Sequence, residues 1–131
     1  MALPAKLQNE IKQFQRLQQE LAAVQQQRLQ LDLKVREVSH TLEELKSLPE
    51  DAVVYRPIGG QLVKAKNRQE VETLLTEDKE TSEIRLKAIE RQENHLKERY
   101  TSMQQELTQA LQTAGVQGAV SEGPEESSPE S

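Results

Sequence analysis

Apolar residues recur along the first third of the chain with the spacing of a heptad repeat, whose positions are lettered a to g. The a positions are residues 7, 14, 21, 28, 35 and 42, and the d positions are residues 10, 17, 24, 31, 38 and 45. Only Glu10 and Arg28 interrupt this apolar seam. The pattern predicts a long helix that packs against one partner helix. Pro49 should end the helix, because the residue before a proline avoids helical conformation. We therefore assign residues 1–48 to a first coiled-coil helix.

Residues 49–67 have a different pattern, with two short apolar runs on either side of Gly59 and Gly60. Such runs around a glycine turn predict a β-hairpin. An isolated two-stranded hairpin is only marginally stable in water, and the sequence offers no third strand. We therefore expect strands from other subunits to cover the hairpin in a sheet or barrel. The predicted oligomerisation residues are its apolar side chains, which point to both faces: Val53, Val54, Tyr55, Ile58, Leu62 and Val63.

Helical spacing resumes in residues 68–114, although charged and small residues weaken the start of the seam. The expected seam positions are Leu75, Lys79, Ser82, Leu86, Ile89, Glu93, Leu96, Tyr100, Met103, Leu107 and Ala110. Gly115 and Gly118 should end this second coiled-coil helix. Residues 115–131 are acidic and rich in serine, proline and glycine, so we expect a disordered acidic tail.

Two helices of similar length joined by a compact hairpin can pair in antiparallel fashion. The sequence thus predicts a mainly α fold: a long antiparallel two-helix coiled coil joined by one β-hairpin, which assembles into a β-barrel between subunits. Counting back from Leu48 beside Gln69 places Phe14 opposite Met103. The same count places Arg28 one layer from Glu93, so these two residues are the predicted register pair. In the alternative, each charged group reaches water over its own aliphatic stem.

Composition narrows the range of functions. The chain has a net charge of -5, no cysteine, 2% aromatic residues and 34% hydrophobic residues, below the roughly 45–50% typical of globular domains. The absence of cysteine excludes disulfides and thiolate metal sites. No apolar stretch approaches the ~20 residues that span a bilayer, and no block of basic residues suggests nucleic-acid binding. We expect a cytoplasmic protein that contacts neither membrane nor nucleic acid.

Enzyme chemistry finds no support in the sequence. His40 and His95 fall on different helices and out of register, so we expect both at the surface. Gly59 and Gly60 lack the spacing and the following Lys-Ser/Thr of a phosphate-binding loop. We therefore predict a non-enzyme with no catalytic residues, no cofactor and no metal.

The hairpin region also resembles a known family. Residues 48–56 (Leu-Pro-Glu-Asp-Ala-Val-Val-Tyr-Arg), followed by Ile58-Gly59 and Leu62-Val63-Lys64, resemble the hairpin of archaeal-type prefoldin β subunits. Residues 85–93 resemble that family's stretch leading into the distal coil, and the likeness extends over roughly residues 7–111. One hairpin between the helices is the β-type layout, whereas α-type subunits have two. The resemblance implies a hetero-hexamer of two α and four β subunits (α2β4), whose hairpins form β-barrels.

The resemblance also implies a function, that of an ATP-independent chaperone (a holdase). Such a hexamer captures unfolded client proteins at the tips of its coiled coils and transfers them to a group II chaperonin. Apolar residues that the seam does not use should then be exposed at the helix ends, and these are Leu3, Ile11, Leu111 and Val116. Leu7, Phe14 and Leu107 join them if the ends fray. For Phe14 and Leu107, ordinary seam packing is the alternative. The predicted client-binding residues are Leu3, Leu7, Ile11, Phe14, Leu107, Leu111 and Val116.

Other functions stay open at this point. A structural or tethering coiled-coil scaffold would have no chaperone activity, although a hairpin between matched helices is unusual for one. An adaptor could dock its helices onto another complex. A homo-oligomer without α subunits is a third possibility.

Overall fold

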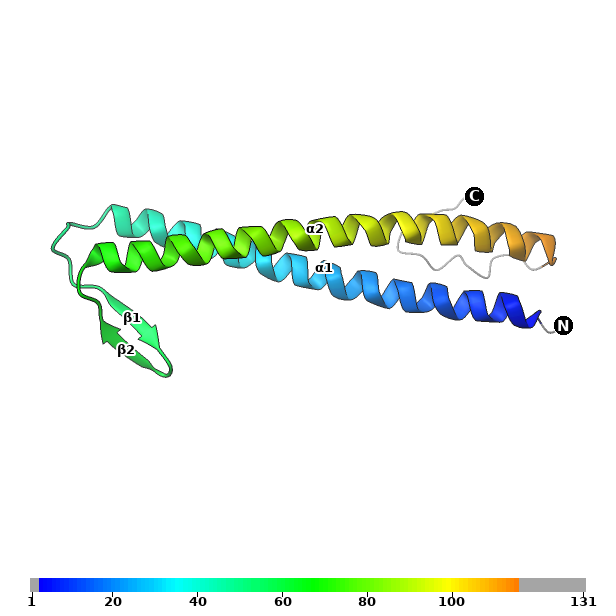
Figure 1. The fold of residues 1–131 in the computed structure, drawn as a ribbon, viewed down its shortest axis with the longest axis horizontal. Coiled ribbons are helices and arrows are strands. Elements are labelled where there is room, and N and C mark those ends of the chain that lie inside the picture. The colour runs from blue at the N-terminus through cyan, green and yellow to red at the C-terminus, as the bar shows by residue number, and fades with distance from the viewer. Residues whose placement is uncertain (1–2, 116–131) are drawn as a thin grey trace. The chain divides into compact units, whose positions relative to one another are not determined.

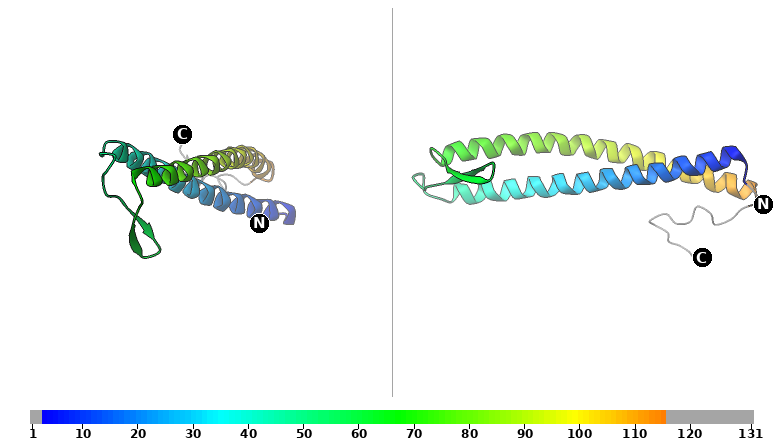
Figure 2. Two further views of the ribbon diagram at one scale, coloured as in Figure 1. Left: turned by 60° about the vertical axis from the view of Figure 1, so that its left-hand side comes forward. Right: turned by 90° about the horizontal axis from the view of Figure 1, so that it is seen from below.

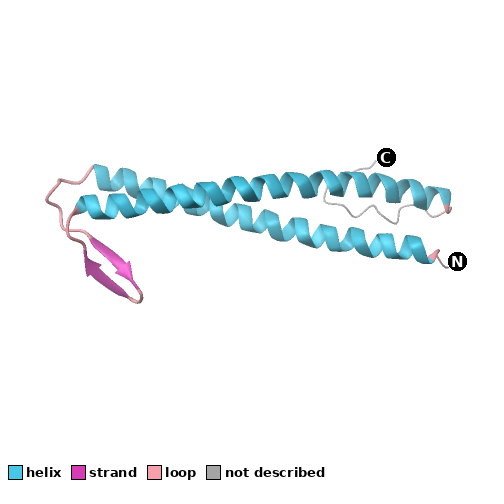
Figure 3. Ribbon diagram, in the orientation of Figure 1, coloured by secondary structure: helices cyan, strands magenta, loops and turns pink. Residues whose placement is uncertain are grey.

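The structure is a computed structural model that describes residues 3–115. Four elements follow one another along the chain: helix α1 (Ala5–Lys46), strands β1 (Tyr55–Ile58) and β2 (Gln61–Lys64), and helix α2 (Arg68–Thr113) (Figures 1 and 3). The expected fold of two long helices joined by one antiparallel hairpin is thus confirmed. The acidic tail predicted for residues 115–131 falls, apart from Gly115, outside the described residues.

The chain divides into two compact units, which we describe separately. The hairpin unit comprises residues 26–90, and the described part of the helix-end unit comprises residues 3–25 and 91–115. In each unit a stretch of α1 and a stretch of α2 lie side by side and run in opposite directions (Figure 2). The paired stretches bury the apolar seam of each helix.

The heptad pattern agrees closely with burial along both helices. Every a and d position predicted in α1 is buried or half-buried, and so is every seam position predicted in α2. Along α1 the e positions, residues 11, 18, 25, 32 and 39, are also half-buried, whereas the g positions, residues 6, 13, 20, 27, 34 and 41, are exposed. The seam on α1 is therefore covered along its e side and open along its g side.

The hairpin forms around a two-residue turn. Ile58 pairs with Gln61, and Gly59 has a φ of 60°, a left-handed conformation that glycine adopts without steric cost. A positive φ at only the first turn residue is the pattern of a II′ turn, which suits the twist of a hairpin. The first strand begins only at Tyr55, because the Ala52 N–H donates to the Pro49 carbonyl (3.1 Å) in a turn that follows α1.

An apolar cluster, which we call the base cluster, joins the hairpin to both helices. It consists of Leu45 from α1, Ala65 just after β2 and Val71 from α2, with Val54 and Leu75 packed against it. The Ala65 N–H donates to the Val54 carbonyl at 2.9 Å, which extends the pairing of the two strands toward the cluster. Hydrophobic burial therefore fixes both strands of the hairpin where the helices meet it.

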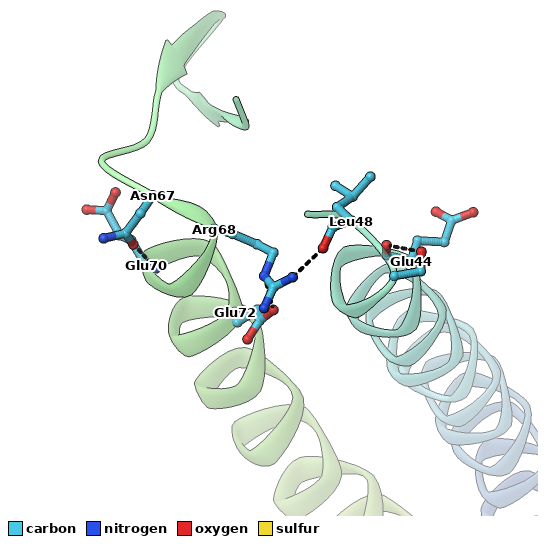
Figure 4. Close-up of polar contacts among 7 residues, drawn as sticks. Glu44, Leu48, Asn67, Arg68, Glu70 and Glu72 are labelled. Carbon is cyan, nitrogen blue, oxygen red and sulfur yellow. Dashed lines mark hydrogen bonds and ion pairs between the residues drawn. The ribbon is translucent and has the colours of Figure 1, made fainter. Parts of the chain in front are cut away.

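Polar contacts at the start of α2 reinforce this junction (Figure 4). The Asn67 side chain accepts a hydrogen bond from the Glu70 N–H at 2.9 Å, which makes Asn67 the N-cap of α2. Arg68 donates to the Leu48 carbonyl just beyond α1 and forms an ion pair with Glu72 (2.9 Å). Arg68 thereby links the first turn of α2 to the segment that follows α1.

Glu70 connects the same turn to the hairpin. Its carboxylate accepts a hydrogen bond from the Lys66 N–H at 2.8 Å and lies 3.6 Å from the Arg56 guanidinium on β1. An acidic side chain in the first turn of a helix also interacts favourably with the helix dipole. One carboxylate therefore ties the first turn of α2 to the residues that precede it and to β1.

Candidate functional site

A groove lies in the helix-end unit, between the beginning of α1 and the end of α2. Its volume is about 670 Å³. Its apolar lining residues are Pro4, Leu7, Met103, Leu107, Ala110 and Ala114, and its polar ones are Lys6, Glu10, Gln13, Glu106 and Thr113. We call it the tip groove. An apolar floor with a mixed polar rim suits an apolar side chain that enters from a polar chain.

The groove forms because two seam positions hold residues that do not fill the space between the helices. Ala110 stands at a seam position where the repeat normally has a large residue, and Met103 is only half-buried. Leu111 takes over the seam at the end of α2 and is 1% exposed. Since a side chain four residues after Leu107 lies on the same helical face, Leu111 packs inward and leaves the space beside Ala110 open.

The predicted client-binding residues have different environments in the structure. Leu7, Phe14, Leu107 and Leu111 are buried, so the expectation that Leu111 is exposed at the tip is wrong. Leu3 and Ile11 are half-buried, and Val116 lies outside the described residues. Among the described residues of the predicted set, the tip groove brings together only Leu7 and Leu107.

The groove also contains residues that the sequence did not single out for client binding, among them Pro4, Ala110 and Ala114. The available signal was the spacing of Ala110 and Ala114, two small residues four positions apart on one face of α2.

Phe14 and Tyr100 form an aromatic pair in the helix-end unit. Their ring centroids are 5.0 Å apart and the rings are tilted by 31°. The register placed Met103 opposite Phe14, and the observed ring contact lies one layer away from that position. Tyr100 is buried, and its hydroxyl oxygen has no hydrogen-bond partner among residues 3–115. The ring of Phe14 therefore packs within the seam between the two helices in this structure.

The two residues of the predicted register pair lie in different units. Glu93 belongs to the helix-end unit, is 4% exposed and forms an ion pair with Lys97 at 3.4 Å. Arg28 belongs to the hairpin unit and is half-buried. The pairing of Arg28 with Glu93 stays a prediction.

Most of the predicted oligomerisation residues form an exposed apolar surface, which we call the hairpin surface. Its members are between 39% and 73% exposed: Val53, Tyr55, Ile58, Leu62 and Val63. Val54 is half-buried because it packs against the base cluster. A hairpin of two such short strands would not normally expose this much apolar area if it stood alone.

The described part of the chain contains no cluster of potential metal ligands. Within residues 3–115, no three His, Asp or Glu side chains come close enough to hold a metal ion together. His40 is exposed, and its Nε2 lies 3.2 Å from the Glu44 carboxylate on the same face of α1. No helix in the described residues is long and apolar enough to cross a membrane.

Comparison with known proteins identifies the family. Residues 8–114 match the sequence profile of the family described as "Prefoldin subunit". The prefoldin subunit beta of Archaeoglobus fulgidus is 44% identical over 109 residues, which cover 83% of this chain and 93% of that protein. The prefoldin subunit beta of Methanococcoides burtonii is 36% identical over 113 residues, with 86% and 96% covered.

A solved structure agrees with the sequence matches. The crystal structure of the prefoldin beta subunit from Thermococcus strain KS-1 has a TM-score of 0.75 and 36% sequence identity. The match covers 84% of this chain and 96% of that one. The chain belongs to the prefoldin family of chaperone subunits, as a β-type subunit.

Proposed function

We propose that this chain is a subunit of a cytoplasmic, ATP-independent holdase that captures unfolded proteins at the ends of its helices. The observation that carries the proposal is the tip groove, an apolar-floored space of about 670 Å³ at the free ends of α1 and α2 in a prefoldin β-type chain. Apolar side chains that an unfolded protein exposes fit such a space without any requirement for a particular sequence.

The hairpin surface supports assembly with other prefoldin subunits. Four apolar side chains are exposed on two short strands and a fifth, that of Val53, is exposed just before β1. Both outer edges of the two-stranded sheet carry unpaired backbone groups. Strands from neighbouring subunits would cover the side chains and pair the edges in a closed barrel. We propose the α2β4 hetero-hexamer, with this chain as one of the four β subunits.

Several tip grooves in one assembly would act together. A single groove holds a few side chains and releases them readily, whereas several grooves on one assembly gain avidity without new contacts. Weak individual contacts also allow release, and we propose that the client passes to a group II chaperonin. Capture by apolar contact needs no nucleotide, which agrees with a non-enzymatic mechanism.

The test measures light scattering of a denatured model protein diluted into the assembly of this chain with a prefoldin α subunit, without ATP. Met103→Gln places an amide in the tip groove at nearly unchanged length, and we expect it to weaken suppression of aggregation. Leu33→Gln is the matched control, because Leu33 is 56% exposed and does not line the groove. Equal loss in both variants would contradict capture in the groove. No suppression by the wild-type assembly would favour a scaffolding coiled coil.

Assembly has its own test. Leu62 is the most exposed apolar residue of the hairpin surface, so Leu62→Ser should reduce association with the α subunit in sedimentation velocity. Leu29→Ser, at a 49% exposed leucine on α1, should leave it unchanged. A hexamer that forms equally well with Leu62→Ser would exclude the hairpin surface as the assembly interface.

A further inference from the structure

The end of α2 turns the chain sharply. Gly115 has a φ of 81°, and its N–H donates to the Gln112 carbonyl at 3.0 Å. This left-handed glycine and this hydrogen bond are two features of the Schellman motif, in which the following residue packs an apolar side chain back onto the last turn of the helix. The following residue is Val116. Ala110 and Ala114, at the end of the same helix, line the tip groove.

The segment after the turn has suitable chemistry for the groove. Residues 116–131 lie outside the described part of the structure, and their sequence begins Val-Gln-Gly-Ala-Val before the first glutamate, Glu122. Five extended residues reach about 16 Å, which is enough to cross a groove that begins at the segment's own attachment point. The two valines supply apolar side chains of the kind that the floor, with Leu7, Met103 and Leu107, accommodates.

The charges on the rim favour this apolar part of the tail over its acidic part. Glu10 and Glu106 line the groove together with a single cation, Lys6. Carboxylates repel one another at short range, so the glutamates that begin at Glu122 are kept outside the groove. The apolar residues 116–120 are the part of the tail that these charges admit.

We infer that residues 116–120 of this chain occupy its own tip groove when no client is bound. The tail is then an internal competitor, and its effect on clients rests on the function proposed above. Because the segment is tethered at the rim, its effective concentration is in the millimolar range, and weak contacts suffice for occupancy. If the segment fills the groove for about three-quarters of the time, the apparent affinity for a client falls about fourfold.

Occupancy can be tested without any client. The chain has two methionines, of which Met103 lines the groove. A ¹³C-methyl label on methionine therefore reports on the groove by NMR in the full chain. A dissolved paramagnetic agent should broaden the Met103 signal more in Val116→Ser/Val120→Ser than in the unaltered protein. Glu125→Gln/Glu126→Gln keeps the valines and serves as the control, with no change expected. Equal broadening in all three proteins would overturn the inference. So would broadening of the Met103 signal in the glutamate control that is as strong as in the valine variant.

A client assay separates this inference from the proposed function. Binding of a fluorescently labelled unfolded protein should tighten about fourfold in the valine variant if the tail competes for the groove. Protection of Met103 together with unchanged client affinity would keep the docked tail and remove the groove as the client site. Unprotected Met103 in a protein that still captures clients would remove the docked tail and leave the proposed function intact.

Discussion

The buried hydroxyl of Tyr100 gives the sharpest stability prediction, because removing it should make the protein more stable. The Tyr100 side chain is 7% exposed and its ring packs against Phe14. Its hydroxyl oxygen is shielded from solvent and has no hydrogen-bond partner among the described residues. Tyr100→Phe deletes this one atom and keeps the ring contact.

The magnitude follows from the cost of an unpaired polar group. A buried donor or acceptor without a partner costs about 1–3 kcal/mol. Tyr100→Phe recovers this free energy without creating a cavity between the rings. We take the lower end, a gain of about 1 kcal/mol in the free energy of unfolding, which for a chain of this length corresponds to a rise in Tm of roughly 3–5 °C.

The assay is thermal unfolding followed by circular dichroism at fixed, low protein concentration, since association would shift Tm by mass action. The chain provides a matched control in its only other tyrosine. Tyr55 is 55% exposed in the single chain, so Tyr55→Phe should change the free energy of unfolding by less than about 0.5 kcal/mol. A fall in Tm for Tyr100→Phe would show that the hydroxyl makes a stabilising hydrogen bond, and the reasoning would be refuted.

Three further predictions concern polar contacts. Asn67→Ala removes the N-cap of α2 and should lower the free energy of unfolding by about 1 kcal/mol in urea titrations; no loss would deny the cap its role. Lys34 and Asp78 lie 3.2 Å apart and are about half-exposed, so a double-mutant cycle should give a coupling below about 1 kcal/mol that shrinks in high salt. A coupling that does not change with salt would contradict a solvent-exposed ion pair between these two residues. For Arg28 and Glu93, the sequence register predicts a coupling above about 0.5 kcal/mol, and a value near zero would reject the pair.

Most of the architecture could be predicted because each helix buries the residues along one side. The spacing of apolar residues in the sequence shows which side that is. The hairpin was equally accessible, since Gly59 and Gly60 separate two β-prone runs. The exact start of β1 was not, because the turn from Pro49 to Ala52 competes with strand pairing there. The end of the α2 seam was also missed. Ala110 and Leu111 both lie near the seam, and the larger side chain took the buried position.

The candidate site was less predictable than the fold. A groove depends on how far side chains from two helices fill the space between them, and the heptad pattern records polarity but not volume. Leu7 and Leu107 were expected at the tip and do line the groove. Ala110 contributes open space to the groove, and this contribution depends on its small side chain lying beside the neighbouring helix.

The base cluster has a consequence for the order in which the chain folds. Leu45 and Val71 meet in this cluster across a loop of about 25 residues, whereas Leu7 and Leu107 meet at the tip groove only after about 100 residues are closed off. The loop-entropy difference, two doublings of length, is about 1.2 kcal/mol. We therefore expect contacts near the hairpin to form first, and the pairing of the two helices to extend from there toward their free ends. On heating the order is reversed, so amide hydrogens near the tip groove should exchange with solvent sooner than those beside the hairpin.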